Sequence, residues 1–167
     1  AVSERCDCLD RMADLLEYHK AELIALCHRE AGKTLQDSLD EVREAVDFCR
    51  YYAARGEELE EDDRFAPRGV VLCISPWNFP LAIFLGQVAA ALVSGNTVIA
   101  KPAEQTSLIA LRALQLMEYV GLPAGVVQSV IAEGPDVGAA LLPDERIKAV
   151  MFTGSTQTAR WLAQALA

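Results

Sequence analysis

An asparagine held between two prolines is the most informative polar group in the sequence. Asn78 lies in the string Ser-Pro-Trp-Asn-Phe-Pro (75–80), directly after the apolar run 70–74. Pro76 and Pro80 restrict the residues before them to extended conformations, so we expect a stiff turn after a buried strand. A side-chain amide in such a place can donate to an oxygen that gains negative charge during a reaction. The same string is also typical of a rigid turn filled with aromatic side chains.

Polar residues or glycines follow three further apolar runs, which are 97–100, 126–131 and 149–152. After these runs come Lys101 with Glu104, then Gly134, then Gly154 with Ser155. The carboxyl ends of parallel strands lie at one edge of a sheet, where open α/β sheets bind their ligands. We therefore expect these groups to share one cleft with Asn78.

The chemistry of these groups suits a nucleotide. Lys101 and Glu104 are able to hydrogen-bond the hydroxyls of a ribose, although a pair three residues apart is also typical of a solvated surface ion pair. Gly134 allows close approach of a nucleotide or simply makes a tight turn. Ser155, at a strand-to-helix junction, suits a phosphate or serves as a plain helix cap. The usual dinucleotide fingerprint and the P-loop are both absent, which argues against a kinase or NTPase.

The alternation of apolar strands and helices from residue 69 onward predicts a Rossmann-like α/β fold, a parallel sheet covered by helices on both faces. Two amphipathic helices precede it in residues 1–56. The first is expected over 3–30, and the second begins with a cap at Thr34 and stops at Arg55 and Gly56. Residues 57–68 are acidic and predict a linker, and residues 69–167 form the partial nucleotide-binding domain. A cap at Thr106 or Ser107 is expected to open the helix after Lys101.

Composition narrows the function classes. The chain has 167 residues and a formal net charge of −9, which argues against nucleic acid and anionic membranes as direct partners. Its five cysteines lack the spacing of a metal site, so we expect no metal and read them as reduced, mostly buried thiols. The longest apolar run, 81–93, is too short to span a bilayer, and charges interrupt the N-terminal residues. We expect a cytoplasmic protein.

Three ordered motifs resemble the aldehyde dehydrogenase superfamily along essentially the whole chain. They are the string at 75–80, the string Lys-Pro-Ala-Glu-Gln-Thr at 101–106 and the string Phe-Thr-Gly-Ser-Thr at 152–156. Residues 30–34 and 41–48 most resemble the branch that oxidises glutamate γ-semialdehyde, the open form of 1-pyrroline-5-carboxylate. In style the chain is similar to the dehydrogenase modules of bacterial proline utilisation A.

The resemblance implies NAD as cofactor, an aldehyde as substrate and a set of residue roles. It makes Asn78 the catalytic oxyanion donor and places Phe79 and Glu44 at the substrate. The residues that it assigns to the cofactor are Ile74, Ser75, Trp77, Lys101, Glu104, Gly134, Gly154 and Ser155. It also implies a homo-oligomeric parent protein, which in some forms is fused to a proline dehydrogenase domain.

The chain departs from the family pattern in two places. The family's nucleophilic cysteine and general-base glutamate follow the motif at 152–156, and none of the five cysteines here occupies the nucleophile's motif. The linker 57–68 is shorter than the family's oligomerisation segment. The chain thus resembles a piece of the NAD-binding domain, and we expect that piece alone to be inactive. The alternatives are another aldehyde or semialdehyde dehydrogenase, or a non-catalytic nucleotide-binding or assembly module.

Overall fold

The computed structural model of the chain describes residues 1–60 and 65–167. In this part of the chain the strands form one four-stranded parallel sheet in the order β3-β2-β1-β4. The strands are β1 (Val70–Ile74), β2 (Thr97–Lys101), β3 (Val127–Ser129) and β4 (Ile147–Phe152). Strand β1 is a continuous apolar run, as expected for a strand covered on both faces. The edge strands differ from the predicted runs: β3 covers only 127–129 of 126–131 and has two exposed polar residues, and β4 begins two residues before 149.

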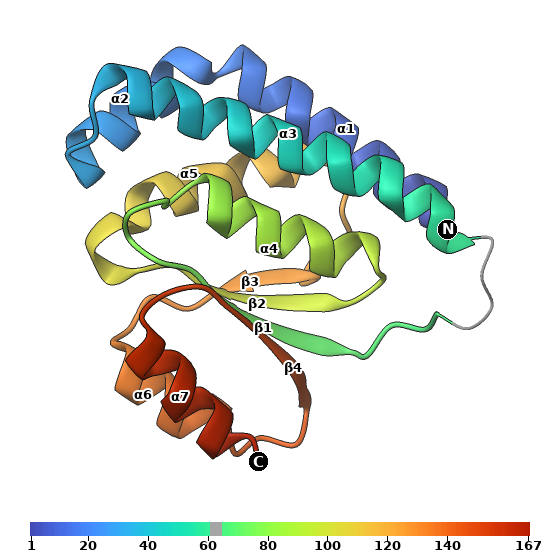
Figure 1. Cartoon of the computed structure of the whole chain (residues 1–167). Coiled ribbons are helices and arrows are strands. Elements are labelled where there is room, and N and C mark those ends of the chain that lie inside the picture. Colours follow the sequence, from blue (N-terminus) through green and yellow to red (C-terminus); the bar gives the residue numbers. More distant parts are fainter. Residues whose placement is uncertain (61–64) are drawn as a thin grey trace.

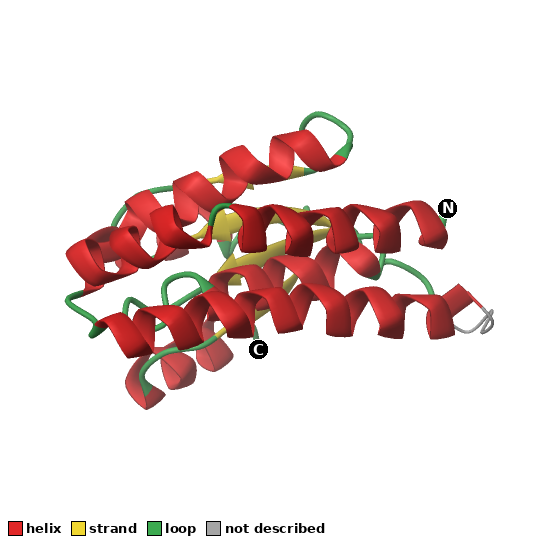
Figure 2. Cartoon of the chain, turned by 90° about the horizontal axis from the view of Figure 1, so that it is seen from above, coloured by secondary structure: helices red, strands yellow, loops and turns green. Residues whose placement is uncertain are grey.

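Helices cover both faces of this sheet, as predicted (Figure 1). Helices α4 and α5 lie on one face, α6 and α7 lie on the other, and α1 to α3 form an outer layer beyond α4. Seen from above, α1 and α3 run lengthwise side by side (Figure 2). The helices are α1 (Val2–Tyr18), α2 (Lys20–Ala31), α3 (Leu35–Glu60), α4 (Ala82–Val93), α5 (Ser107–Met117), α6 (Gly134–Leu141) and α7 (Thr156–Ala165), with single 3-10 turns at Glu104–Thr106 and Glu118–Val120.

The core is a large apolar cluster that joins the outer helices to the sheet, with a smaller second cluster between α1, α3 and α4. Helix α4 lies at its centre and is buried nearly all round, because it is covered by α3 on one side and by the sheet on the other. Fully buried side chains come from each layer, among them Met12, Leu16, Leu23, Leu72, Phe84, Leu85 and Ile109. The N-terminal helices α1 and α3 thus pack on α4.

Two helix boundaries follow the predicted chemistry. Gly32 ends α2 in the left-handed conformation, with φ of 66°. Such a φ favours glycine because it has no Cβ to clash with the backbone. The Thr34 hydroxyl oxygen accepts a hydrogen bond from the backbone N–H of Asp37 at 3.1 Å, and so caps the start of α3.

Two helix-boundary predictions were wrong. The helix expected over 3–30 is two helices, which meet at His19. Helix α3 does not stop at Gly56 but continues to Glu60, so the first residues of the predicted linker are helical. Gly56 is needed there for packing, because a Cβ at this position would lie 2.3 Å from Cγ2 of Val93. Residues 61–64 of the predicted linker lie outside the described residues.

The start of α5 is also capped differently from the prediction. Neither Thr106 nor Ser107 caps it with a side chain. The carboxylate of Glu30, at the end of α2, instead accepts the N–H groups of Leu108 at 2.7 Å and Ile109 at 2.9 Å. A cap supplied by a residue 78 positions away leaves no local signal in the sequence.

The five cysteines are all free and buried, as expected for reduced thiols. Across residues 1–60 and 65–167, no helix has both the length and the apolar character needed to cross a bilayer.

Candidate functional site

A groove of about 590 Å³ opens at the carboxyl edge of the sheet, and most of the predicted site residues line it. The carboxyl ends of strands β1, β2 and β4, with the loops that follow them, all contribute residues to its wall. The predicted residues in its wall are Ile74, Ser75, Trp77, Asn78, Phe79, Lys101, Glu104, Gly154 and Ser155.

The strand order explains where the groove opens. The chain adds β2 and β3 on one side of β1 and then returns to place β4 on the other side. The loops leaving β1 and β4 therefore diverge, and an open α/β sheet binds its ligands at such a switch point. In the register of the sheet, Ile74 lies between Lys101 of β2 and Phe152 of β4. The last residues of three strands thus lie in a row beneath the groove.

Lys101 and Glu104 form an ion pair in the groove wall, with Nζ 3.0 Å from Oε1. The Lys101 residue is only 4 % exposed, and its ammonium also donates to the carbonyl of Pro102 at 3.2 Å. The pair is thus not the solvated surface pair that the spacing alone also allowed. Burial of this kind requires polar partners. These two partners use two of the three ammonium donors, which leaves one for a hydroxyl in the groove.

The Glu104 carboxyl has a pKa below its usual value. Burial acts to raise that pKa, but hydrogen bonds from the backbone of Glu104, from Lys101 and from the backbone of Gly134 outweigh it. The carboxylate therefore stays ionised at neutral pH and is ready to accept hydrogen bonds. The contribution from Gly134 also places the start of α6 beside this pair.

Asn78 lies at the tip of the turn after β1, exposed to the groove. Within the described part of the chain, its side-chain amide makes no hydrogen bond. Trp77 and Phe79 on either side are exposed as well, whereas Pro80 is buried and anchors the turn. An amide in this setting is free to donate to an oxygen atom in the groove.

Two buried polar groups beside the groove are incompletely satisfied. The hydroxyl of Ser75 is buried in the groove wall and lacks a partner among the described residues. Gln87 of α4 donates from Nε2 to the carbonyl of Ile74 at 3.1 Å and to Oγ1 of Thr153 at 3.2 Å, so it bridges the ends of β1 and β4. Its Oε1 has no partner in the same region. Buried polar groups are normally hydrogen-bonded, so a bound water or a polar ligand would complete each of these two.

Ser155 caps α7, since its hydroxyl accepts a hydrogen bond from the N–H of Thr158 at 3.1 Å. The plain capping role is thus observed, and the same helix start faces the groove. Gly154 precedes it in close contact with Phe152, whose ring would lie 2.7 Å from a Cβ at this position. Only a glycine fits this approach without moving the ring.

A second groove of about 540 Å³ adjoins the first between α6 and α7. Gly134 lines this second groove and not the first. Ile74, Lys101 and Thr158 line both grooves, so the two grooves form one continuous depression. Trp161 gives its far wall an aromatic surface, and a Cβ on Gly134 would meet nothing within 4 Å.

Glu44 is the predicted residue that the structure does not bring to the site. It is exposed on α3 and lines neither groove. Conversely, sequence reasoning missed three groups that hold the site together, which are Gln87, Lys33 and Glu41. Their contacts join segments far apart in the chain. The only hint of them in the sequence is a glutamine inside the apolar run 81–93.

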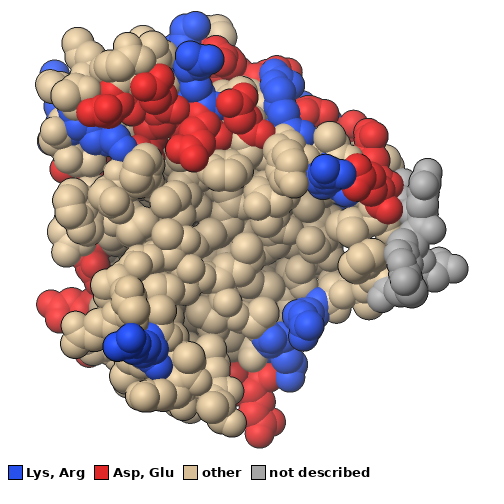
Figure 3. Space-filling view, in the orientation of Figure 1, with Lys and Arg blue, Asp and Glu red and all other residues tan. Residues whose placement is uncertain are grey.

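Charge is distributed unevenly over the face shown in Figure 3. Acidic side chains gather over α1 to α3 at the top of the view, whereas the middle of the same face carries few charges. Exposed acids on α3 include Asp37, Asp40, Glu44 and Asp47.

Comparisons with known proteins agree with this geometry. The model of the aldehyde dehydrogenase family matches residues 1–167. The bifunctional protein PutA of Salmonella typhimurium is 52 % identical over 98 % of the chain, and a 1-pyrroline-5-carboxylate dehydrogenase of Bacillus mycoides is 42 % identical over 90 %. The solved NAD⁺ complex of an aldehyde dehydrogenase from Bacillus cereus superposes on 99 % of the chain with a TM-score of 0.91 and 37 % identity.

The chain spans only part of each of these relatives. It covers 12 % of the length of the Salmonella protein, 32 % of the Bacillus mycoides enzyme and 36 % of the solved chain. The match to the family model nevertheless includes every residue, and the shared fold includes the parallel sheet and its covering helices. This chain belongs to the aldehyde dehydrogenase family.

Proposed function

We propose that the whole protein oxidises an aldehyde to a carboxylate with NAD, and that its substrate is L-glutamate γ-semialdehyde. The observation that carries this proposal is the convergence of Asn78, Lys101, Glu104 and Ser155 on one continuous depression in a chain of the aldehyde dehydrogenase family. The choice of substrate is supported by the 1-pyrroline-5-carboxylate dehydrogenases among its relatives.

The residues of the groove fit NAD on physical grounds. The Lys101–Glu104 pair offers both a donor and an acceptor to a ribose diol, and the buried hydroxyl of Ser75 lacks a partner. A negatively charged Glu104 repels a 2′-phosphate, which favours NAD over NADP. The start of α7 at Ser155 suits a pyrophosphate. The second groove, with Gly134 and Trp161, suits the flat adenine ring.

Asn78 has a separate role in the proposed chemistry. When a nucleophile adds to an aldehyde carbon, the carbonyl oxygen gains negative charge. The Asn78 amide at the groove edge donates to that oxygen and stabilises the charge. Bound NAD supplies the hydride acceptor. Phe79, next to Asn78 and exposed, gives the aldehyde an apolar wall, and Glu44 stays a weaker candidate for the substrate end.

The test is an assay of NADH formation by the whole protein that carries this chain. We expect turnover with glutamate γ-semialdehyde, at a higher kcat/KM than with acetaldehyde or succinic semialdehyde, and a preference for NAD over NADP. A preference for another aldehyde would refute the proposed substrate but would still agree with NAD-dependent aldehyde oxidation. Absence of turnover with all aldehydes, together with tight nucleotide binding, would favour a non-catalytic nucleotide-binding module.

A further inference from the structure

A buried ion pair links the N-terminal helices to the turn that carries Asn78. Glu41 of α3 has a fully buried side chain, and the side chain of its partner Lys33, in the segment between α2 and α3, is 12 % exposed. The Lys33 ammonium donates to Oε2 of Glu41. Burying two charges is costly unless further hydrogen bonds satisfy both groups, so the remaining contacts of the pair indicate what it is for.

The second carboxylate oxygen of Glu41 holds the start of α4. Oε1 accepts the backbone N–H groups of Leu81 at 2.9 Å and of Ala82 at 3.0 Å. Helix α4 has no side-chain cap of its own, because its cap position is a leucine. A carboxylate at the positive end of a helix is favoured both by these N–H groups and by the helix dipole. Glu41 therefore replaces the missing local cap from a neighbouring helix.

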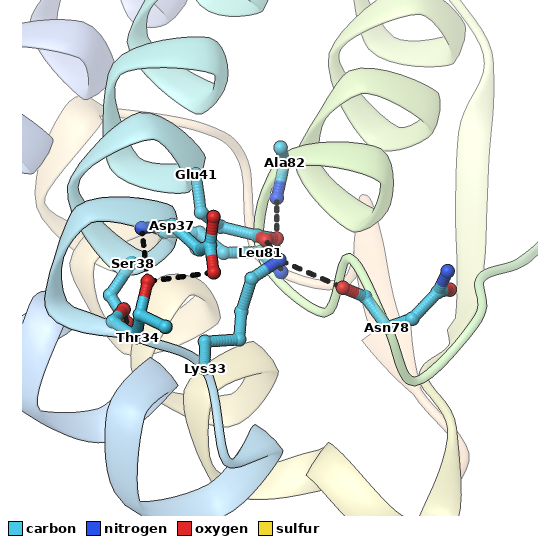
Figure 4. A network of polar contacts seen from close by, with 8 residues as sticks. All are labelled: Lys33, Thr34, Asp37, Ser38, Glu41, Asn78, Leu81 and Ala82. Carbon is cyan, nitrogen blue, oxygen red and sulfur yellow. Dashed lines mark hydrogen bonds and ion pairs between the residues drawn. The ribbon is translucent and has the colours of Figure 1, made fainter.

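Lys33 holds the turn just before that helix. Its Nζ donates to the backbone carbonyl of Asn78 at 2.8 Å and lies 4.1 Å from the centre of the Phe79 ring. Figure 4 shows the Asn78 carbonyl directed at Lys33 and the side-chain amide pointing away from it. Together, Lys33 and Glu41 contact residues 78, 79, 81 and 82, and neither of them binds the side-chain amide of Asn78.

We propose that Lys33 and Glu41 are positioning residues that aim the Asn78 amide at the reacting oxygen; this rests on the proposed function. The Asn78 side chain has no partner of its own in the described residues, so its direction depends on the backbone that carries it. Pro76 and Pro80 restrict the residues before them, but they leave the peptide after Asn78 able to rotate. The hydrogen bond from Lys33 fixes that peptide, and a misplacement of about 1 Å at such a group costs about a hundredfold in rate.

The decisive experiment is a double-mutant cycle in the whole protein. Lys33→Met is introduced into the wild type and into Asn78→Ala, and kcat and NAD affinity are measured for all four proteins. If Lys33 acts through Asn78, Lys33→Met lowers kcat by about tenfold or more in the wild type and by less than about twofold in the Asn78→Ala background. NAD affinity stays unchanged. An equal loss in both backgrounds, or no loss in the wild type, would overturn the proposal.

Two further variants keep the test clear of general destabilisation. Lys20→Met removes an exposed lysine whose ion pair to Glu17 is 3.6 Å long, and is expected to leave kcat unchanged. Glu41→Gln keeps the shape and one oxygen acceptor of Glu41 but removes its charge. It is expected to behave like Lys33→Met in the cycle.

Hydrogen exchange of the whole protein provides a readout that needs no activity. Lys33→Met and Glu41→Gln are each expected to speed exchange in the peptide that contains Leu81 and Ala82, whereas Lys20→Met does not. Unchanged exchange in both variants would refute the positioning role even in an active enzyme. If both variants exchange faster but the wild-type protein oxidises no aldehyde, the proposed function alone is refuted.

Discussion

At the scale of single residues, Lys101 shows how position in a sheet changes the meaning of a sequence pattern. A lysine three residues before a glutamate is typical of a weak surface pair, and the sequence left that interpretation open. Lys101 is the last residue of β2, aligned with Ile74 of β1, and it is buried in the structure although it lines the groove. The pairing partner was predictable from spacing, whereas the burial was not.

The first residue-scale prediction concerns the protonation of Glu104. Its pKa is lowered in the folded protein, so the ionised form is favoured above the ordinary value of 4.5 and lost only as the pH falls through the lower folded value. NAD affinity of the whole protein should therefore stay constant from about pH 8 down to about pH 5. Isothermal titration calorimetry checks this. A fall in affinity centred above pH 5 would contradict the role of Glu104.

Removal of the Glu104 charge should weaken the same binding step. In the whole protein, Glu104→Gln is expected to raise the NAD dissociation constant by about tenfold, because hydrogen bonds to charged groups are the stronger ones. Gln105→Ala, at the next position in the same groove wall, is the matched control and should leave affinity unchanged. Equal affinities for Glu104→Gln and the wild type would place the ribose elsewhere.

Asn78 is expected to affect the chemical step instead. Asn78→Ala in the whole protein should lower kcat by about 10²–10³, the usual cost of removing one oxyanion donor. NAD affinity should survive, because the amide is not among the groups that we assign to the cofactor. Steady-state kinetics and calorimetry on the same preparation separate the two effects. Unchanged kcat would remove Asn78 from the mechanism.

At the scale of elements, the strands were easier to predict than the helix ends. The boundaries of β1 follow directly from a continuous apolar run between Gly69 and Ser75. The break between α1 and α2 at His19 could not be seen, because the apolar spacing continues through it without a glycine or a proline. Helix ends that depend on distant caps, such as that of α5 on Glu30, lie beyond any local pattern.

Gly56 was misread for a related reason. Glycine often marks the end of a helix, but here it lies inside α3 where three helices meet. A Cβ would lie 2.3 Å from Val93 of α4 and 2.7 Å from Sγ of Cys6 of α1. Its smallness therefore serves the packing of the outer layer.

Gly56→Ala tests this packing role. Helix propensity alone would favour alanine by about 1 kcal/mol, whereas overpacking costs about 1–3 kcal/mol. We expect net destabilisation of the whole protein, seen as a lower unfolding midpoint in urea. The control Ala54→Gly changes an exposed position of the same helix. It should lower the free energy of unfolding only by the difference in helix propensity between alanine and glycine. A stabilised Gly56→Ala protein would show that the helices can move apart freely.

At the scale of the whole molecule, the sheet gathers groups that the sequence spreads over about eighty residues. The shared edge was predictable, because parallel strands deliver their carboxyl ends to the same side. The supports of the site were not, because Lys33 contacts a residue 45 positions away and Gln87 one 66 positions away. Glu44, assigned by resemblance alone, lies outside the grooves and stays a prediction.

The five thiols lead to a prediction about the chain taken by itself. Burial raises the pKa of Cys27, Cys49 and Cys73 to about 12, so these thiols are protonated at neutral pH, and Cys6 and Cys8 are buried as well. A thiolate is the reactive form of cysteine. The 167-residue chain should therefore form no NADH with any aldehyde. Turnover that disappears on thiol alkylation would contradict this expectation.

The most direct test of the account is a crystal structure of the whole protein with NAD bound. We expect the ribose hydroxyls within hydrogen-bonding distance of Lys101 and Glu104, the pyrophosphate at the start of α7 beside Ser155, and the nicotinamide facing the turn of Asn78. A dinucleotide bound away from the carboxyl edge of the sheet, or a nicotinamide remote from Asn78, would contradict the central claim that cofactor and aldehyde meet in this groove.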